Sequence, residues 1–331
     1  MGNVAKYQHG WNMTFTVVEL LMIIPKSTYL SISLPYFSIY HFFSLTLLLI
    51  DTWGTLLALI VSKLKKETKN VDFMIKALLL DVDGTLLSFE THAVSQSSID
   101  ALRKAHDRGI KIVIATGRSA CDLREIESVP YDGIIALNGA DCILHDGTVI
   151  RRSPIPDKDF KKAMEIAREF DFAVALELDE GIFVNRLTPI VEKIARIVEH
   201  PVPPVVDIEE MFGKKECCQL CFYFDDETER KVMPLLPTLS SSRWHPLFAD
   251  INVAGTSKAA GLSLFADYYK IEPLEIMACG DGGNDIPMLK AAGIGVAMGN
   301  ASEQVKSVAD FVTDTVDDNG LCKVLKRFGL I

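Results

Sequence analysis

Several features that mark common protein classes are absent from this chain of 331 residues. No stretch has the spacing Gly-x-x-x-x-Gly-Lys-Ser/Thr, which excludes a P-loop nucleotide site. The glycine-rich turn GDGGND at 280–285 has Asp285 where a dinucleotide-binding fingerprint has its third glycine. Neither of these two familiar nucleotide-binding loops therefore explains the chain.

Cysteine is also scarce. The seven cysteines are an odd number scattered over a long chain, which excludes a disulfide framework and favours a reducing compartment. Cys217, Cys218 and Cys221 do cluster, but no second cysteine pair or nearby histidine completes the four ligands of a closed zinc site. We therefore interpret the segment CCQLCFYF as a half-buried strand in which cysteine serves as a small apolar residue.

Basic residues are outnumbered by acidic ones. Lys and Arg number 34 against 44 Asp and Glu, which gives a formal net charge of −10. Residues 1–73 hold six lysines and four acidic residues, so the excess of negative charge belongs to the remainder. Because phosphate backbones demand a basic face, no nucleic-acid partner is expected.

Residues 27–50 contain no charged side chain at all, and the apolar character continues to Ser62 with Asp51 as an interruption. About 20 apolar residues are enough to cross a bilayer, so one membrane span fits within 27–62. The basic flank KLKKETK at 63–69 would then face the cytoplasm and place the catalytic part of the chain there. Asp51 in mid-membrane would cost about 2.5–3.5 kcal/mol, which counts against the span.

A second interpretation of the N-terminal residues stays open. Met74 begins the segment MIKALLLDVDGTLL, a natural start for a soluble domain whose first strand follows at once. Residues 1–73 would then be a hydrophobic extension that does not belong to the native protein.

The remainder of the chain alternates strand-like and helix-like segments. Apolar runs at 75–80, 111–116 and 133–137 predict strands, and the stretches 96–108 and 119–127 predict helices. Strand–helix–strand repeats of this kind predict a parallel sheet with both faces covered. The fold class is therefore α/β.

A different pattern interrupts this alternation from about residue 141. The segment CILHDGTVIRR reads as a hairpin, and it is followed by helices, strands and a loop. The predicted elements are helices at 157–170, 189–199 and from about 227, strands at 173–178, 181–185 and 217–224, and a loop at 201–206. The first pattern then returns, with a helix near Lys258, a strand at 275–279, a helix after Asn284, strand-like segments at 293–298 and 310–314, and a last helix. The predicted divisions are an extension (1–73), a first core part (74–153), an inserted α/β module (154–248) and a second core part (249–331).

The segment DVDGT places two carboxylates, Asp81 and Asp83, directly after the first core strand. Residues i and i+2 of a strand point the same way, so both can reach one site at the strand's carboxyl end, where open α/β sheets bind ligands. Two carboxylates so close repel each other unless a cation holds them, which favours a hard metal such as Mg²⁺. An Asp-Gly turn that merely caps the strand also fits these residues.

Three more segments are candidate parts of the same site, and each is weaker evidence for it when taken alone. In ATGRS (115–119), Thr116 and nearby backbone N–H groups at a helix start can bind an anion. In GTSKAAG (255–261), Lys258 opposes the helix dipole, which an anionic partner would explain. GDGGNDIPML (280–289) offers Asp281 and Asp285 within one turn. Each also fits a plain turn, cap or surface lysine, but together they follow predicted core strands in a fixed order.

With the four motifs DVDGT, ATGR, a lone Lys and GDGGND, residues 74–331 resemble phosphatases of the haloacid dehalogenase (HAD) superfamily. The similarity is to the Cof-like group, which carries a large α/β cap (type C2) between its second and third motifs. ALNGA (136–140) and GVAMGNA (295–301) are also similar to that group. The resemblance implies a Rossmann-like core with an inserted cap. It further implies Mg²⁺-dependent hydrolysis of small phosphate monoesters, such as sugar phosphates or phosphorylated cofactors.

The resemblance also implies roles for the acidic residues. Asp81 attacks phosphorus and forms an aspartyl-phosphate. Asp83 protonates the leaving alcohol and then activates water. Asp81, the main-chain carbonyl of Asp83 and Asp281 hold the metal, and Asp285 supports them.

Other residues are implied to hold the substrate. Thr116, Gly117 and Lys258 bind the phosphoryl oxygens, and Asn284 helps to position Lys258 or the phosphate. Asn138, at the entry to the cap, is a candidate substrate contact. Arg118 either contacts phosphate or forms a salt bridge on the following helix, and the sequence favours the salt bridge.

Two other functions remain open. A phosphomutase uses the same aspartyl-phosphate but returns the phosphate to its substrate. A membrane-tethered regulatory or binding module would have lost turnover, although every motif residue that the chemistry needs is present. A P-type ion pump is excluded, because it would need several membrane spans and a phosphorylation loop with a different sequence.

Overall fold

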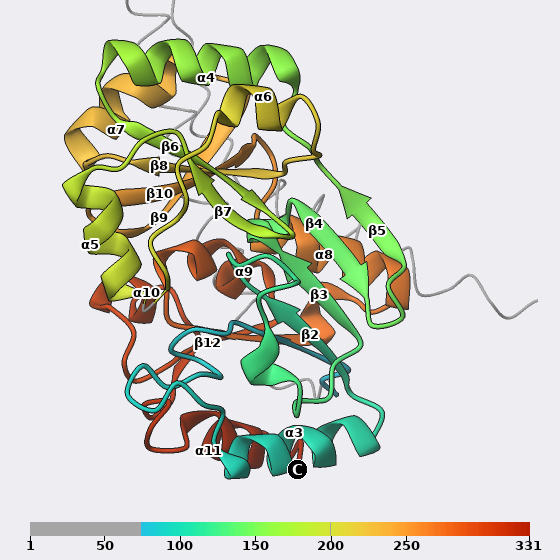
Figure 1. Cartoon of the computed structure of the whole chain (residues 1–331). Coiled ribbons are helices and arrows are strands. Elements are labelled where there is room, and N and C mark those ends of the chain that lie inside the picture. Colours follow the sequence, from blue (N-terminus) through green and yellow to red (C-terminus); the bar gives the residue numbers. More distant parts are fainter. Residues whose placement is uncertain (1–73, 199) are drawn as a thin grey trace, which may run out of the picture. The chain divides into compact units, whose positions relative to one another are not determined.

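The computed structural model describes residues 74–198 and 200–331 (Figure 1). The predicted membrane span at 27–62 and the question of a non-native extension lie outside these residues. Among the helices within 74–198 and 200–331, none has the length and apolar character to cross a membrane.

The larger of the two sheets has eight strands in the order β13-β12-β11-β1-β2-β3-β4-β5. The first six strands in that order are parallel to one another, and β4 and β5 are antiparallel at one edge. The strands are β1 (Ala77–Leu80), β2 (Lys111–Ala115), β3 (Gly133–Ala136), β4 (Asp141–Leu144), β5 (Val149–Arg152), β11 (Ile276–Gly280), β12 (Ile294–Ala297) and β13 (Phe311–Val312). The hairpin expected after residue 141 is therefore present, and it extends this sheet.

Helices cover both faces of the eight-stranded sheet. Along β1, Leu78 and Leu80 pack in a core with helices α3 (Gln96–Asp107) and α11 (Gly320–Arg327). The alternate residues Ala77 and Leu79 pack with α8 (Lys258–Tyr269) and α9 (Ile286–Ala291), near the short helix α10 (Glu303–Lys306). This alternation requires both faces to be apolar, which explains the continuous hydrophobic runs in the sequence.

The second sheet has five strands in the order β7-β6-β8-β10-β9, and all of its pairs are antiparallel. Helices α4, α6 and α7 pack on one face around Phe222, and α5 packs on the other. The elements are α4 (Asp157–Glu169), β6 (Ala173–Leu178), β7 (Gly181–Val184), α5 (Pro189–Ile197), α6 (Ile208–Phe212), β8 (Gln219–Tyr223), α7 (Asp226–Val232), β9 (Leu239–His245) and β10 (Phe248–Val253). The two sheets confirm the predicted fold class, an α/β core with a parallel sheet and an inserted α/β module.

Two local predictions were wrong. The helix expected at 119–127 is only a 3-10 turn, η2 (Arg124–Ile126), because residues 119–122 form a tight turn instead. The cysteine-rich strand β8 is buried on both faces rather than half-buried. The second sheet extends to Val253, which pairs with Leu239 of β9, so the strand β10 runs past residue 248. The strand β9 was missed, since its sequence LSSSRWH has no clear apolar alternation.

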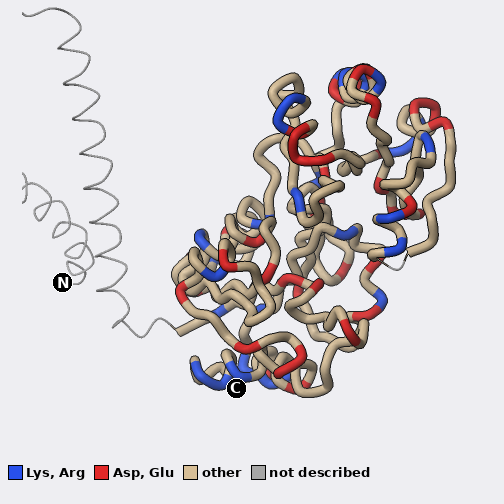
Figure 2. The backbone as a smooth tube through the Cα atoms, turned by 90° about the vertical axis from the view of Figure 1, so that its left-hand side faces the viewer, with Lys and Arg blue, Asp and Glu red and all other residues tan. Residues whose placement is uncertain are grey.

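Charged residues of both signs are interspersed along most of the described chain (Figure 2). The basic residues of α11, which include Lys323, Lys326 and Arg327, are grouped near the C terminus. Such mixing is typical of solvated surfaces.

Candidate active site

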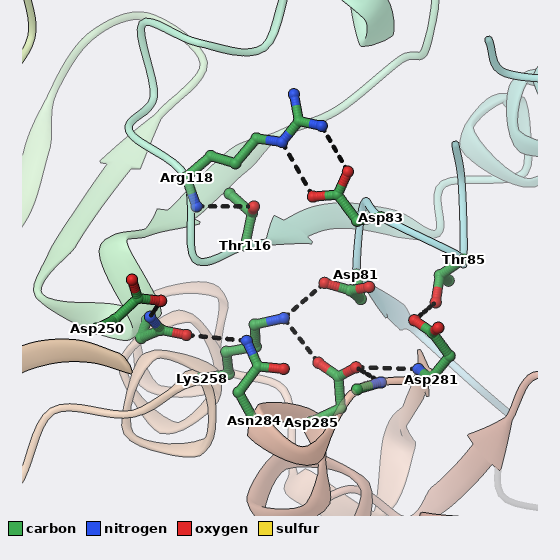
Figure 3. Close-up of polar contacts among 12 residues, drawn as sticks. Asp81, Asp83, Thr85, Thr116, Arg118, Asp250, Lys258, Asp281, Asn284 and Asp285 are labelled. Carbon is green, nitrogen blue, oxygen red and sulfur yellow. Dashed lines mark hydrogen bonds and ion pairs between the residues drawn. The ribbon is translucent and has the colours of Figure 1, made fainter. Parts of the chain in front are cut away.

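The acidic motifs come together because their strands are neighbours in the sheet. β1 lies between β11 and β2, and all three run parallel in register. Their carboxyl ends therefore meet at one edge, where Asp81 follows β1, Thr116 follows β2 and Asp281 follows β11 (Figure 3). The structure thus gathers residues that are up to 200 positions apart in the sequence, as the motif order predicts.

Lys258 lies between two carboxylates at the centre of this cluster. Its Nζ is 2.6 Å from Asp81 Oδ1 and 2.7 Å from Asp285 Oδ1. Lys258 is the first residue of α8, whose N-cap Ser257 accepts a hydrogen bond from the backbone of Ala260. The lysine side chain is only 1% exposed, so these two ion pairs are buried. The position of Lys258 at a helix start predicts an anionic partner. In the structure, Asp81 and Asp285 are that partner.

The cluster holds more negative than positive charge. Burial and the neighbouring Asp285 raise the pKa of Asp81 well above its usual value, although Lys258 acts in the opposite direction. Burial and Asp285 likewise raise the pKa of Asp281, to about 7. Burial acts to lower the pKa of Lys258, but the charges of Asp285 and Asp81 outweigh it and raise that pKa. One lysine therefore does not neutralise these carboxylates, which leaves room for a further cation.

The donor set suits a hard divalent cation. Asp81, Asp281 and Asp285 each offer one carboxylate oxygen, and these oxygens lie within 4.8 Å of one another. Asp285 is already engaged, because its Oδ1 accepts from Lys258 and its Oδ2 accepts from the backbone N–H groups of Asp281 and Gly282. Asp81 and Asp281 are therefore the better-placed ligands, and an all-oxygen set of this kind is typical of Mg²⁺.

Asp281 is held in place by residues to which the sequence assigned no role. Asn300 Nδ2 donates to Asp281 Oδ2 at 3.0 Å and to the carbonyl of Gly84 at 2.9 Å. Thr85 Oγ1 lies 3.5 Å from Asp281 Oδ1. Gly84 itself has φ of +78°, and a Cβ there would stand 2.3 Å from Asp281 Oδ2, so only glycine fits this turn. The segment GVAMGNA, which contains Asn300, was the one signal that could have indicated this support.

Asp83 extends away from the lysine and meets Arg118. Arg118 Nε donates to Asp83 Oδ2 at 2.9 Å, and its Nη2 donates to the other carboxylate oxygen (Figure 3). The Nη1 atom lies 3.4 Å from Glu125, and the backbone N–H of Arg118 donates to Thr116 Oγ1. Of the two roles considered for Arg118, the structure shows the salt bridge, to Glu125 in the following helix η2, and adds a second, closer one to Asp83.

Asn138 joins the two sheets at the edge of the site. Its backbone is left-handed, with φ of +52°, and its side chain is only 2% exposed. Asn138 Nδ2 donates to Asp250 Oδ2 at 3.0 Å and to Gln219 Oε1 at 3.2 Å, both from the second sheet. Its Oδ1 accepts from Asn284 Nδ2 at 3.0 Å. The side chain of Asn284 thus bonds to Asn138, and its predicted role in positioning Lys258 or the phosphate stays a prediction.

A second cluster, in which two of the three residues are buried and Glu177 is half-buried, lies on β6, β8 and β10, and sequence reasoning missed it. Glu177, Cys221 and Asp250 place a ligand atom each within 4.8 Å of one another. Burial raises the pKa of Glu177 to about 7 and that of Asp250 well above its usual value. The only sequence signal for this cluster was a single acidic residue within each of two apolar runs, Glu177 in AVALEL and Asp250 in FADINV.

Known proteins share this architecture. The model of the haloacid dehalogenase-like hydrolase family matches residues 78–325. A 5-amino-6-(5-phospho-D-ribitylamino)uracil phosphatase of Bacillus subtilis, YcsE, is 29% identical over 265 residues, which cover 78% of this chain and 98% of that protein.

Solved structures agree with the sequence relatives. A phosphatase of the HAD superfamily from Bacteroides thetaiotaomicron is 79% identical with a TM-score of 0.77, covering 79% of this chain and 98% of that one. A sugar phosphatase of HAD subclass IIB is 38% identical with a TM-score of 0.70, covering 77% of this chain and 100% of that one. The chain therefore belongs to the haloacid dehalogenase-like hydrolases and is a phosphatase of the Cof-like group of that superfamily.

Proposed function

We propose that the protein hydrolyses small phosphate monoesters with Mg²⁺, through an aspartyl-phosphate on Asp81. The observation that carries this proposal is the position of Asp81, which shares a buried site with Lys258 and Asp281 at the carboxyl end of β1. A carboxylate nucleophile divides hydrolysis into two easier steps. Sugar phosphates or phosphorylated cofactors are the proposed substrates, in line with the names of the similar proteins.

In the first step, an oxygen of Asp81 attacks phosphorus and the bond from phosphorus to the leaving oxygen breaks. Asp83 donates its proton to that oxygen, so the product leaves as an alcohol. In the second step, water attacks phosphorus, Asp83 takes a proton from it, and the phosphate departs with Asp81 restored.

The remaining motif residues hold the phosphoryl group. Phosphoryl transfer spreads negative charge over three oxygens, so catalysis depends mainly on positioning and on positive charge. Lys258, Thr116 and the backbone of Gly117 are proposed to contact these oxygens. Mg²⁺, held by Asp81, Asp281 and the main-chain carbonyl of Asp83 with Asp285 in support, would supply further positive charge.

We also propose that the two domains have different tasks, one carrying the chemistry and the other covering the site. Every residue assigned to the chemistry lies in the domain of the eight-stranded sheet, either after a strand or, like Lys258, at the start of a helix that covers the sheet. The segment from residue 154 to the end of β10 would act as the cap. Inserted domains of this kind exclude water and select the substrate.

The first prediction is that metal removal stops the reaction. The purified protein should release phosphate from at least one member of a panel of sugar phosphates, nucleotides and phosphorylated cofactors in Mg²⁺. Excess EDTA should abolish that release, and added Mg²⁺ should restore it, because the carboxylates otherwise repel the phosphate. Turnover that persists in EDTA contradicts the metal requirement. Transfer of phosphate back to the substrate, without release, would identify a phosphomutase instead.

A second prediction separates the two acids. Asp83→Ala should lower turnover by about 10²- to 10⁴-fold, which is the usual worth of a general acid–base group. It should leave Mg²⁺ affinity nearly unchanged, since only the main-chain oxygen of Asp83 is assigned to the metal. Isothermal titration with Mg²⁺ measures this, with Asp281→Asn as the matched variant that should lose affinity. Weakened Mg²⁺ binding in Asp83→Ala would show that its carboxylate is a ligand.

A further inference from the structure

Arg118 is a charged side chain beside the acid–base residue, and the proposed reaction gives it no role. The residues on either side of it, Gly117 and Ser119, both bond to the second sheet. We propose that Arg118 is a positioning residue that aims the carboxyl group of Asp83, and that Glu177 and Gln219 of the second sheet place Arg118 by holding its main chain. This inference rests on the proposed function, because it concerns how the acid of that reaction is held.

The contact between Arg118 and Asp83 is two-pronged. The Nε and Nη2 atoms donate to separate oxygens of the carboxylate, in the parallel arrangement that a guanidinium and a carboxylate prefer. Such a pair fixes the plane of the carboxylate as well as its distance. Asp83 is 40% exposed, so without this partner its side chain would be free to rotate in solvent.

Each of the three guanidinium nitrogens has a carboxylate partner in this arrangement. The remaining terminal nitrogen, Nη1, points to Glu125 Oε1 at 3.4 Å. The edge formed by Nε and Nη2 is thus occupied by Asp83. This geometry favours a positioning role over the phosphate contact that the sequence also allowed.

The main chain around Arg118 is held from the second sheet. Gln219 Nε2 donates to the carbonyl of Gly117 at 3.0 Å, and the backbone N–H of Ser119 donates to Glu177 Oε1 at 3.1 Å. A Cβ on Gly117 would lie 3.3 Å from Asp250 Oδ2, which shows how closely the second sheet approaches this loop. Both bonds flank Arg118, whose side chain reaches Asp83.

Glu177 and Gln219 are themselves held rigidly. Gln219 Nε2 also donates to Glu177 Oε2 at 2.7 Å, and Cys221 Sγ lies 3.7 Å from the same oxygen. Gln219 is fully buried, and its Oε1 accepts from both Asn138 and Asn252. A buried network with its bonds satisfied keeps one arrangement, so it can define the position of the loop.

The experiment uses the dependence of a general acid on its leaving group. A poorly leaving alkoxide needs the proton from Asp83, whereas p-nitrophenolate departs readily without it. The kcat/KM for an alkyl phosphate and for p-nitrophenyl phosphate is measured in the full chain, in Arg118→Ala, Glu177→Ala and the double variant. Glu125→Gln is the control, because it touches the same guanidinium on the side away from Asp83.

Arg118→Ala and Glu177→Ala should each lose about tenfold or more in kcat/KM on the alkyl ester beyond any loss on p-nitrophenyl phosphate. The double variant should lose no more than Arg118→Ala alone, since both changes act through one side chain. Glu125→Gln should behave like the unchanged protein. Retained activity on p-nitrophenyl phosphate shows that each variant is folded.

Equal losses on the two esters in Arg118→Ala would overturn the positioning role and indicate a phosphate contact. Losses that multiply in the double variant would overturn the part assigned to Glu177. If the unchanged protein releases no phosphate from either ester, the proposed function itself fails, which is a distinct result.

Discussion

Asp81→Asn is expected to abolish phosphate release while the protein stays folded. An amide cannot attack phosphorus as a carboxylate does, so the loss should be at least ~10³-fold, as for other catalytic nucleophiles. The fold should persist because the amide oxygen can still accept from Lys258 Nζ, which lies 2.6 Å from Asp81 Oδ1. Removing one charge from a site crowded with carboxylates also lowers their mutual repulsion.

Two assays on the same preparation test this prediction: phosphate release gives the turnover, and urea unfolding shows whether the protein is folded. Asp146→Asn is a suitable control, because Asp146 is an exposed residue in the β4–β5 hairpin. Its turnover should match that of the unchanged protein. Comparable turnover in Asp81→Asn would remove Asp81 from the nucleophile's role.

Lys258→Met is expected to cost both turnover and stability. The change leaves Asp81 and Asp285 buried without the cation that pairs them. Removing one partner of a buried ion pair typically destabilises a protein by about 3–5 kcal/mol. Turnover should fall as well, because Lys258 is the chain's own positive charge beside the proposed phosphoryl site.

The stability loss should depend on pH in a defined direction. Burial already raises the pKa of Asp81 above its unfolded value, and without Lys258 that pKa should rise further. A carboxyl group with a raised pKa binds its proton more tightly in the folded state, so its burial costs little below the unfolded pKa and more as the pH rises. Lys258→Met should therefore be closest to the unchanged protein in acid and furthest from it above neutral pH.

Urea unfolding in EDTA at pH 5 and pH 8 tests this expectation. Lys290→Met, at an exposed position of α9, should leave stability within about 0.5 kcal/mol at both pH values. A Lys258→Met protein as stable as the control at pH 8 would show that the two ion pairs contribute nothing to the fold.

Much of the core could be predicted because its signals are local. Continuous apolar runs and helical periodicity indicated a parallel sheet covered on both faces, and β1, β2, β3 and β11 lie close to the predicted ranges. Chain order and the rule that parallel strands share a carboxyl edge then brought Asp81, Thr116 and Asp281 to one place. The strand β9 was missed, because a polar strand such as LSSSRWH carries no such pattern.

The sequence by itself determined which strand ends carry carboxylates, a hydroxyl and a lysine, since each of these lies within a few residues of the strand or helix that presents it. Only the tertiary structure decided their partners. Arg118 meets Asp83 across 35 positions, Asn138 meets Asp250 across 112, and Asn284 meets Asn138 across 146. Contacts at such separations depend on how the two sheets pack, and no local propensity or spacing records that packing.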